Sequence, residues 1–325
     1  MEKLDKLASD VINGKEITID EARSLYDAPL EELCFAADKI RRECMGSSFD
    51  ICTIINGKSG KCSENCRFCA QSGHNHTGVA CYPLLSSEEI VKEAVANYKS
   101  GMMRFSIVTS GKRLSDEEVN LMCDTVRAIH EACPIKVCVS FGLLNEDQFR
   151  RLKEAGVCRV HNNLETSGSY FPKVCTTHTY EDKKEAIRAA RSAGLEVCSG
   201  GLIGMGETRD DRLEMAFTLR ELGIRSVPVN LLNPIPGTPF GDQPVMEYEE
   251  FVRTIAIYRF ILPSAYIRLA GGRGLMPDKG KTCFKSGANA AISGDMLTTS
   301  GITAATDLKL LDSLGYKIGA VSKLN

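Results

Sequence analysis

Short apolar runs alternate with amphipathic helical stretches along most of this 325-residue chain, and this alternation restricts the fold more than any other feature of the sequence. Strands are expected to begin near Cys52, Arg104, Lys136, Arg159, Glu196, Ser226, Tyr266 and Ala290. Helices are expected around residues 87–101, 115–132, 145–155, 180–193, 209–222, 246–261, 276–287 and 304–314. Eight βα units in about 270 residues predict an α/β fold, a (β/α)8 TIM-type barrel, with a doubly wound open sheet as the alternative.

The N-terminal segment is expected to form a short helical cap on the barrel. Apolar residues recur there at roughly helical spacing, at Leu33, Phe35, Ala36 and Ile40. No Pro/Gly/Ser-rich linker and no block of charge divides the remainder. The predicted organisation is therefore an N-terminal helical segment, 1–47, and a barrel, 48–325, in one domain overall.

Local signals mark the ends of two of the expected helices. Ser86 to Glu89 form a capping box before one helix, and Thr179 to Asp182 form another. Gly194 stands where the glycine after a helix end is expected. These signals agree with the boundaries that the apolar periodicity predicts.

The composition is that of an ordinary globular protein, with 43% hydrophobic residues and a formal net charge of -2. It excludes a disordered chain, and the near-neutral charge argues against a broad surface for nucleic acid or anionic membranes. No apolar run approaches the roughly 18 residues that a membrane-spanning helix needs. The first five residues are acidic and amphipathic, unlike a signal peptide, so a cytoplasmic protein is expected.

Fourteen cysteines are many for a chain that is expected to stay in a reducing compartment. Metal ligation or catalysis is then the leading use of the clustered ones. An isolated cysteine is more often a small buried apolar residue. We expect that structural role for Cys34, Cys44, Cys52, Cys123 and Cys133.

Three cysteines follow the first expected strand in a C-x3-C-x2-C run: Cys62, Cys66 and Cys69. Thiolates are the usual ligands of iron–sulfur clusters, and a four-iron cluster ordinarily takes four of them. No fourth cysteine lies within the run, so one iron would be open to bind another molecule. A structural zinc site is the alternative, but zinc usually takes paired C-x2-C units with all four ligands present. The run therefore favours a cluster.

This run, with Phe68 before the last cysteine, resembles the signature of the radical S-adenosylmethionine superfamily. The resemblance implies that Cys62, Cys66 and Cys69 hold a 4Fe-4S cluster whose fourth iron binds S-adenosylmethionine. It also implies that Phe68 packs near the adenine. The cofactor would carry the radical chemistry, while the protein positions and shields it.

Several segments narrow the resemblance to the biotin synthase family. They are residues 69–72 and 77–78, 161–166, 198–208, 226–230 and 266–273. The resemblance implies a homodimeric (β/α)8 enzyme that inserts sulfur at C9 and C6 of dethiobiotin. It implies an auxiliary iron–sulfur cluster as the sulfur source and a reducing partner such as flavodoxin or ferredoxin.

Three polar residues of the fourth strand region share one face by strand alternation: His161, Asn163 and Glu165. Buried polar groups need partners, which a ligand could supply, although a satisfied interior network is the alternative. The resemblance implies that Asn163 and Glu165 bind the ribose of S-adenosylmethionine. It assigns His161, Asn163 and Asn230 to the substrate, with Asn230 at the ureido group. Family members commonly carry Asn at the position of His161.

Gly200 and Gly201 follow the fifth expected strand. Because glycine has no side chain, this segment permits close approach of a ligand to the backbone, and both are candidate cofactor-binding residues. No G-x-G-x-x-G opens a helix here, so the dinucleotide-binding fingerprint is absent.

The auxiliary site departs from the familiar family pattern, a 2Fe-2S cluster held by three barrel cysteines and an arginine. The resemblance places two cysteines at Cys138 and Cys198 and the arginine at Arg268, all with catalytic roles. The first cysteine position is Ser106 here, and serine is a poor iron ligand compared with a thiolate.

Extra thiols in the barrel offer a replacement. Cys175 follows the fourth strand on the loop side, so we expect Cys138, Cys175 and Cys198 to form a substitute triad. Three thiolates suit a four-iron cluster with one open iron. This resembles a variant class associated with anaerobes, with a 4Fe-5S auxiliary cluster, which we favour over 2Fe-2S. Cys158 lies one residue off the face of His161 and is expected to point away.

Three alternatives stay open. The first is another radical enzyme of the same barrel type, such as a methylornithine synthase or a hydrogenase maturase. The second is an iron–sulfur electron carrier without a substrate, which would not cleave S-adenosylmethionine. The third is a structural zinc module, which would be colourless.

Overall fold

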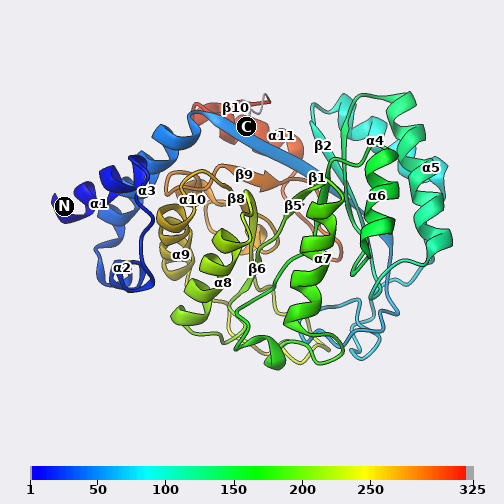
Figure 1. The fold of residues 1–325 in the computed structure, drawn as a ribbon, viewed down its shortest axis with the longest axis horizontal. Helices are drawn as coiled ribbons and strands as arrows, with labels where there is room; N and C mark the ends of the chain where they lie inside the picture. The colour runs from blue at the N-terminus through cyan, green and yellow to red at the C-terminus, as the bar shows by residue number, and fades with distance from the viewer. Residues whose placement is uncertain (1, 320–325) are drawn as a thin grey trace.

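Eight parallel strand positions close into a barrel, because the first strand pairs with both the second and the last (Figure 1). A computed structural model describes residues 2–319 of the chain. The strands are β1 (Ser48–Lys58), β2 (Arg104–Thr109), β3 (Lys136–Ser140), β4 (Arg159–His161), β5 (Glu196–Cys198), β6 (Gly201–Ile203), β7 (Ser226–Leu231), β8 (Tyr266–Leu269) and β9 (Ala290–Ile292). β5 and β6 both pair with β7 and occupy one position of the barrel. The predicted (β/α)8 fold is confirmed.

Helices follow the strands and surround the barrel in Figure 1. They are α4 (Ser87–Lys99), α5 (Asp116–Ala132), α6 (Glu146–Glu154), α7 (Tyr180–Ser192), α8 (Arg209–Glu221), α9 (Tyr248–Ile261), α10 (Lys281–Phe284) and α11 (Ala304–Ser313), with short 3-10 turns η2 (Phe171–Lys173) and η3 (Arg273–Leu275). A short strand, β10 (Lys317–Ile318), pairs with the start of β1. The last residues of the predicted barrel region, 320–325, lie outside the described residues.

The N-terminal cap consists of α1 (Glu2–Ile12), α2 (Ile19–Ser24), the turn η1 (Leu25–Asp27) and α3 (Leu30–Met45). These helices lie beside α9 at the left of Figure 1. Leu33, Ala36 and Ile40 are buried on one side of α3, while Phe35 is 62% exposed. The apolar stripe of α3 therefore excludes Phe35, which the periodicity had grouped with it.

Capping explains where most of the outer helices begin. Each of the helices α4 to α8 starts with a complete capping box, led by Ser86, Ser115, Asn145, Thr179 and Thr208. In each box the side chain of the capping residue accepts a hydrogen bond from the backbone amide of the third helical residue. The side chain of that third residue in turn accepts a hydrogen bond from the backbone amide of the capping residue. Gly194 after α7 has φ of 77°, as expected of a glycine that ends a helix.

The helix expected over 276–287 is the largest secondary-structure difference. Only α10 forms there, because Gly280 adopts a left-handed φ of 87° immediately before it. Asp278 accepts hydrogen bonds from the backbone amides of Gly280 and Thr282. These side-chain bonds compete with a continuous helix.

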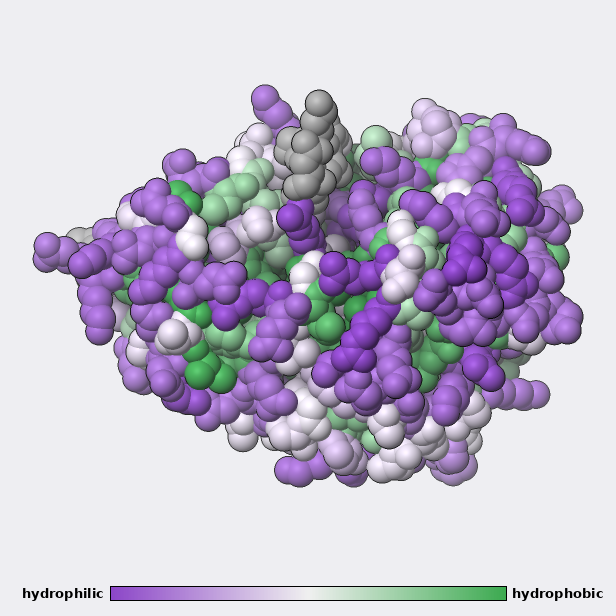
Figure 2. Space-filling model, viewed as in Figure 1, coloured by the Kyte–Doolittle hydropathy of each residue, from purple (hydrophilic) through white to green (hydrophobic). Residues whose placement is uncertain are grey.

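Hydrophilic side chains cover most of the face shown in Figure 2. Among residues 2–319, no helix is both long enough and apolar enough to cross a membrane.

Candidate active site

A cavity of about 370 Å³ opens at the carboxyl ends of the barrel strands. Its wall combines strand ends with the cysteine loop and includes Ile54, Phe68, Cys69, Val108, Ser140, His161, Asn163, Glu165, Leu202 and Asn230. Barrel enzymes carry their active sites at this end, and the volume suits a small molecule. The cavity is therefore the candidate active site.

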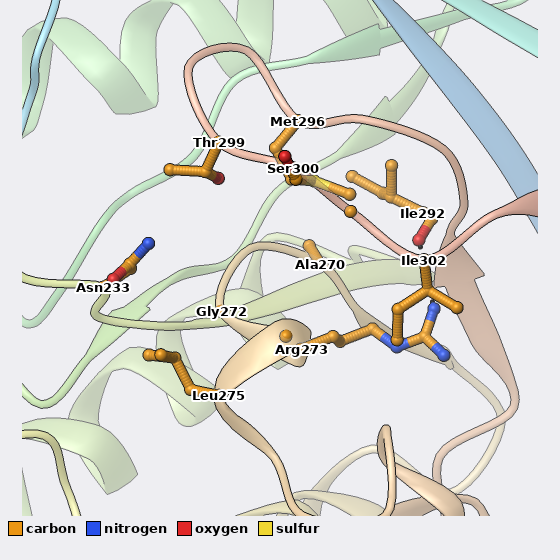
Figure 3. Close-up of a pocket in the computed structure, with 12 residues that line it drawn as sticks. Asn233, Ala270, Gly272, Arg273, Leu275, Ile292, Met296, Thr299, Ser300 and Ile302 are labelled. Carbon is orange, nitrogen blue, oxygen red and sulfur yellow. Dashed lines mark hydrogen bonds between the residues drawn. The ribbon is translucent and has the colours of Figure 1, made fainter.

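A second cavity of about 230 Å³ adjoins the first and shares part of its wall. Figure 3 shows it between a loop that carries Met296 and Thr299 and the segment 270–275 after β8. Asn56 Nδ2 donates to the backbone oxygen of Leu297 at 3.1 Å, which ties this loop to the end of β1. The loop thus forms one side of the entrance.

The loop after β1 brings its three motif cysteines together through backbone hydrogen bonds. The amide of Cys69 donates to the oxygen of Cys66, and the amide of Cys62 donates to the oxygen of Gln71. Asn75 Nδ2 donates to the oxygens of both Cys66 and Cys69, at 3.2 and 2.8 Å. All three thiols are free and half-buried, and Cys69 lines the cavity. The donor set fits a three-thiolate cluster site with one open coordination position.

Burial raises the pKa of Cys69 to about 11. A bound cation of high charge lowers the pKa of the thiols that coordinate it and keeps them ionised. The half-buried loop is therefore suited to a metal centre more than to a free thiolate nucleophile.

Cys175 lies beside this loop. Its Sγ is 3.3 Å from Nδ1 of His178, and the ligand atoms of Cys66, Cys175 and His178 all lie within 4.8 Å of one another. Within residues 2–319, Cys175 makes no hydrogen bond to Cys138 or Cys198. The structure therefore brings together two members of the expected auxiliary triad and places the third next to the three-cysteine run.

Phe68 places its ring on the cavity wall. Behind it lies an apolar cluster formed by Tyr170, Val174, Leu202, Met205, Leu232 and Phe240. The preceding residue, Arg67, anchors the loop through its amide, which donates to the oxygen of Val174. A planar ligand ring could stack against Phe68 in this position.

His161, Asn163 and Glu165 line the cavity together, although β4 ends at His161 and its alternation does not extend to the other two residues. Glu165 has φ of 73°, a left-handed conformation that is uncommon outside glycine. Its amide donates to the oxygen of Gly200, and its oxygen accepts from the amide of Leu202. Burial raises the pKa of the Glu165 carboxyl. A strained backbone held in place by two bonds is typical of a functional position.

The side chain of Asn230 connects two neighbouring strand ends at the cavity. Its Nδ2 donates to the oxygen of Gly201 at 3.0 Å, and its Oδ1 accepts from the amide of Gly271 at 2.8 Å. An amide side chain has two N–H donors and two acceptor lone pairs. One donor and one lone pair are therefore left for a ligand.

Gly200 and Gly201 are packed against the protein's own backbone. A Cβ atom at Gly200 would overlap the backbone oxygen of Pro228, and one at Gly201 would overlap that of Glu165. The cavity wall includes Leu202 but neither glycine. Close packing of β5 and β6 against their neighbours thus accounts for both residues without a ligand.

We expect Gly200→Ala to destabilise the protein by about 1–3 kcal/mol, because the new methyl group must displace a backbone carbonyl of β7. The change is measured as a shift of the denaturant unfolding midpoint. Gly274→Ala is the matched control, since an added Cβ there meets nothing within 4 Å. Equal midpoints for the two variants would show that β7 accommodates the methyl group.

Below the cavity, three buried arginines converge on one buried carboxylate, and these four residues form the floor of the barrel interior. Asp50 lies 3.2 Å from Arg104, 2.9 Å from Arg159 and 3.2 Å from Arg268. Burial alone would raise the pKa of Asp50, but the three guanidinium groups outweigh it and hold that pKa well below its usual value. Arg159 also pairs with the more exposed Glu196 at 2.8 Å. Three positive charges thus face two negative charges, and an anionic group nearby would balance the remainder.

Two expected auxiliary ligands, Cys138 and Cys198, lie in the layer above this floor, and both are completely buried. Burial opposes protonation of the neighbouring His161, but the Cys198 and Cys138 thiols raise its pKa to about 9. His161 Nε2 also lies 3.0 Å from the hydroxyl of Ser106. The expected first position, Ser106, is therefore engaged with a histidine.

The prediction that Cys158 points away from the site is wrong. Its Sγ lies 3.9 Å from Sγ of Cys138 and 3.3 Å from a nitrogen of Arg104. β4 begins at Arg159, so Cys158 precedes the strand and the alternation rule does not apply to it.

Sequence reasoning also missed the floor residues Asp50 and Arg104. A signal was present, because charged residues inside short apolar strands are buried only when they are paired. Their partners lie on distant strands, so no local pattern names them.

The barrel and its three-cysteine loop define the class of protein: they are the fold and the cluster motif of radical S-adenosylmethionine enzymes. The chain matches the "Radical SAM superfamily" over residues 58–219 and the "Biotin and Thiamin Synthesis associated domain" over residues 228–317. It is 50% identical to "Biotin synthase" of Clostridium botulinum over 98% of this chain and 100% of that one. The chain belongs to the biotin synthase family.

Other relatives carry the same name. "Biotin synthase" of Brachyspira hyodysenteriae is 54% identical over 97% of this chain and 95% of its own length. "Biotin synthase" of Akkermansia muciniphila is 53% identical, over 98% and 99%. Among solved structures, methylornithine synthase has a TM-score of 0.83 at 20% identity, covering 97% of each chain. A hydrogenase maturase, HydG, has a TM-score of 0.82 at 18% identity, covering 98% of this chain and 79% of that one. At this identity the structural matches show a shared fold.

Proposed function

We propose that the protein is a biotin synthase, which inserts sulfur at C9 and C6 of dethiobiotin. The observation that carries the proposal is one cavity with a three-cysteine loop at its mouth and a buried layer of thiols and arginines beneath it. A substrate in the cavity would lie between a site that generates radicals and a site that holds sulfur. Family membership at about 50% identity supports the same reaction.

Cys62, Cys66 and Cys69 would hold a 4Fe-4S cluster, and Cys138, Cys198 and Arg268 would contribute to an auxiliary cluster. When bound, S-adenosylmethionine and these clusters supply hydrogen abstraction from carbon and the inserted sulfur. A four-iron auxiliary cluster, 4Fe-5S, stays our preferred composition over 2Fe-2S, because the barrel is rich in thiols.

The polar wall of the cavity would bind and orient the two small molecules. Asn163 and Glu165 would accept hydrogen bonds from the ribose hydroxyls of S-adenosylmethionine, and Phe68 would pack against its adenine. Asn230 has one donor and one acceptor free, which matches the N–H and C=O of a ureido group. His161 lies between the cavity and the thiol layer, where it would contact the substrate. The apolar part of the wall excludes water from the reacting carbon atoms.

The test is an anaerobic single-turnover assay of the reconstituted protein with S-adenosylmethionine, a strong reductant and dethiobiotin. We expect biotin together with about two equivalents of 5′-deoxyadenosine, because two C–H bonds are broken. Deoxyadenosine without biotin would instead indicate a different substrate in the same barrel. A protein that is coloured but does not cleave S-adenosylmethionine would be an electron carrier, and a colourless protein would be a zinc module.

The cellular setting is part of the proposal. Fourteen free cysteines suit a reducing compartment, so we propose a cytoplasmic enzyme that receives electrons from a flavodoxin or ferredoxin. Homodimer formation follows from the family resemblance. An anaerobic host follows from the same resemblance and from the oxygen sensitivity of thiol-rich clusters.

A further inference from the structure

We propose that Cys52 supplies the third thiolate of the auxiliary cluster, in one barrel layer with Cys138, Cys198 and Arg268. The inference rests on the proposed function, because it assumes that an auxiliary cluster occupies this barrel. It gives a ligand role to a cysteine that the sequence pattern assigned to packing alone.

The four residues come from alternate strands of the barrel. Cys52 is on β1, Cys138 on β3, Cys198 on β5 and Arg268 on β8. Because β5 and β6 share one position, these are the first, third, fifth and seventh strands. Side chains inside such a barrel stack in layers of four, each layer drawn from alternate strands. Three cysteines and one arginine thus form a set of four that the architecture places together.

Strand alternation confirms that Cys52 faces the barrel interior. Asp50, two residues before it, pairs with the buried arginines of the floor. Ile54, two residues after it, lines the cavity. Residues i, i+2 and i+4 of a strand point to the same side. Cys52 therefore lies between the charged floor and the cavity.

Direct contacts agree with this placement. Arg268 Nη1 donates to Sγ of Cys52 at 3.3 Å, and both side chains are fully buried. Among the described residues, Nε of Arg268 makes no hydrogen bond, while its Nη2 is paired with Asp50 at 3.2 Å. An unpaired donor of a buried guanidinium beside the Cys52 thiol is what an anionic cluster would satisfy.

The competing candidates are occupied elsewhere. Ser106, the family's usual first position, bonds to His161, and a hydroxyl is a harder and poorer iron ligand than a thiolate. Cys175 lies beside Cys66 and His178, next to the loop after β1. Cys158 touches Cys138, but it precedes its strand and donates to the backbone oxygen of Val137 at 3.1 Å.

The experiment compares Cys52→Ala with the unmodified holoprotein after anaerobic reconstitution, by iron and sulfide content and by Mössbauer spectroscopy. We expect the variant to lose the auxiliary cluster and retain about four irons per chain, the content of the radical cluster. S-adenosylmethionine cleavage without substrate turnover should stay within about two-fold, while biotin formation is lost. Cys123→Ala in α5, also buried, is the matched control and should retain both clusters.

Cys52→Ser tests whether the loss of the cluster in Cys52→Ala comes from a disturbed fold, because serine keeps the size of the side chain. We expect an altered auxiliary-cluster spectrum in this variant. An unchanged auxiliary cluster in both Cys52 variants, or its loss in Cys175→Ala with Cys52 present, would overturn the inference and leave biotin formation by the unmodified protein intact. An unmodified protein with a single cluster and no biotin formation would instead refute the proposed function.

Discussion

Cys62→Ala is expected to abolish S-adenosylmethionine cleavage and biotin formation together, by about 10³-fold or more. The loop after β1 offers three thiols to a cluster that would need all three, so the other two thiols of the run cannot also take the place of Cys62. The measurement is 5′-deoxyadenosine formed per chain under reducing, anaerobic conditions, with iron content determined on the same sample.

Cys81→Ala is the matched control, because Cys81 is an exposed thiol that packs beside Gly60 at the base of the same loop. This variant should keep both activities. Substantial cleavage by Cys62→Ala, or an equal loss in Cys81→Ala, would contradict the assignment of the cluster to the three-cysteine run.

Asp50→Asn is expected to destabilise the protein by about 3–5 kcal/mol, the usual consequence of removing one partner of a buried ion pair. The neutral amide would leave Arg104, Arg159 and Arg268 facing one another at the barrel floor. Like charges in a buried environment repel strongly. The denaturant midpoint of the anaerobically handled protein is the measurement.

Asp124→Asn is the control for this change. Asp124 pairs with Arg127 on the surface of α5, with 75% of its side chain exposed. Because solvent screens such pairs, its midpoint should hardly move. If Asp50→Asn behaves like Asp124→Asn, the arginine floor does not depend on the carboxylate.

Much of the fold is predictable because its signals are local. Strands begin at Arg104, Lys136 and Tyr266 as the apolar runs predict, and the boxes at Ser86 and Thr179 start their helices. The exceptions arise where a side chain or a glycine overrides the periodicity, as Asp278 and Gly280 do before α10.

Some residues of the site are likewise readable from local sequence, whereas others are placed only by the fold. Cys62, Cys66 and Cys69 are close in sequence, so their shared chemistry is readable before any fold is known. Cys175 is a different case, because its loop position after the fourth strand is compatible with several neighbours. Only the folded loops show that it reaches Cys66 rather than the barrel thiols.

The sequence by itself determined the barrel, the cluster motif and the family, because each depends on patterns within short segments. Tertiary structure alone decided which buried residues share a layer. Alternation along a strand tells which side a residue faces, but the height of that residue in a barrel depends on strand tilt and on the stagger between strands. Barrel closure therefore places Cys52 beside Arg268, although 216 positions separate them in the chain.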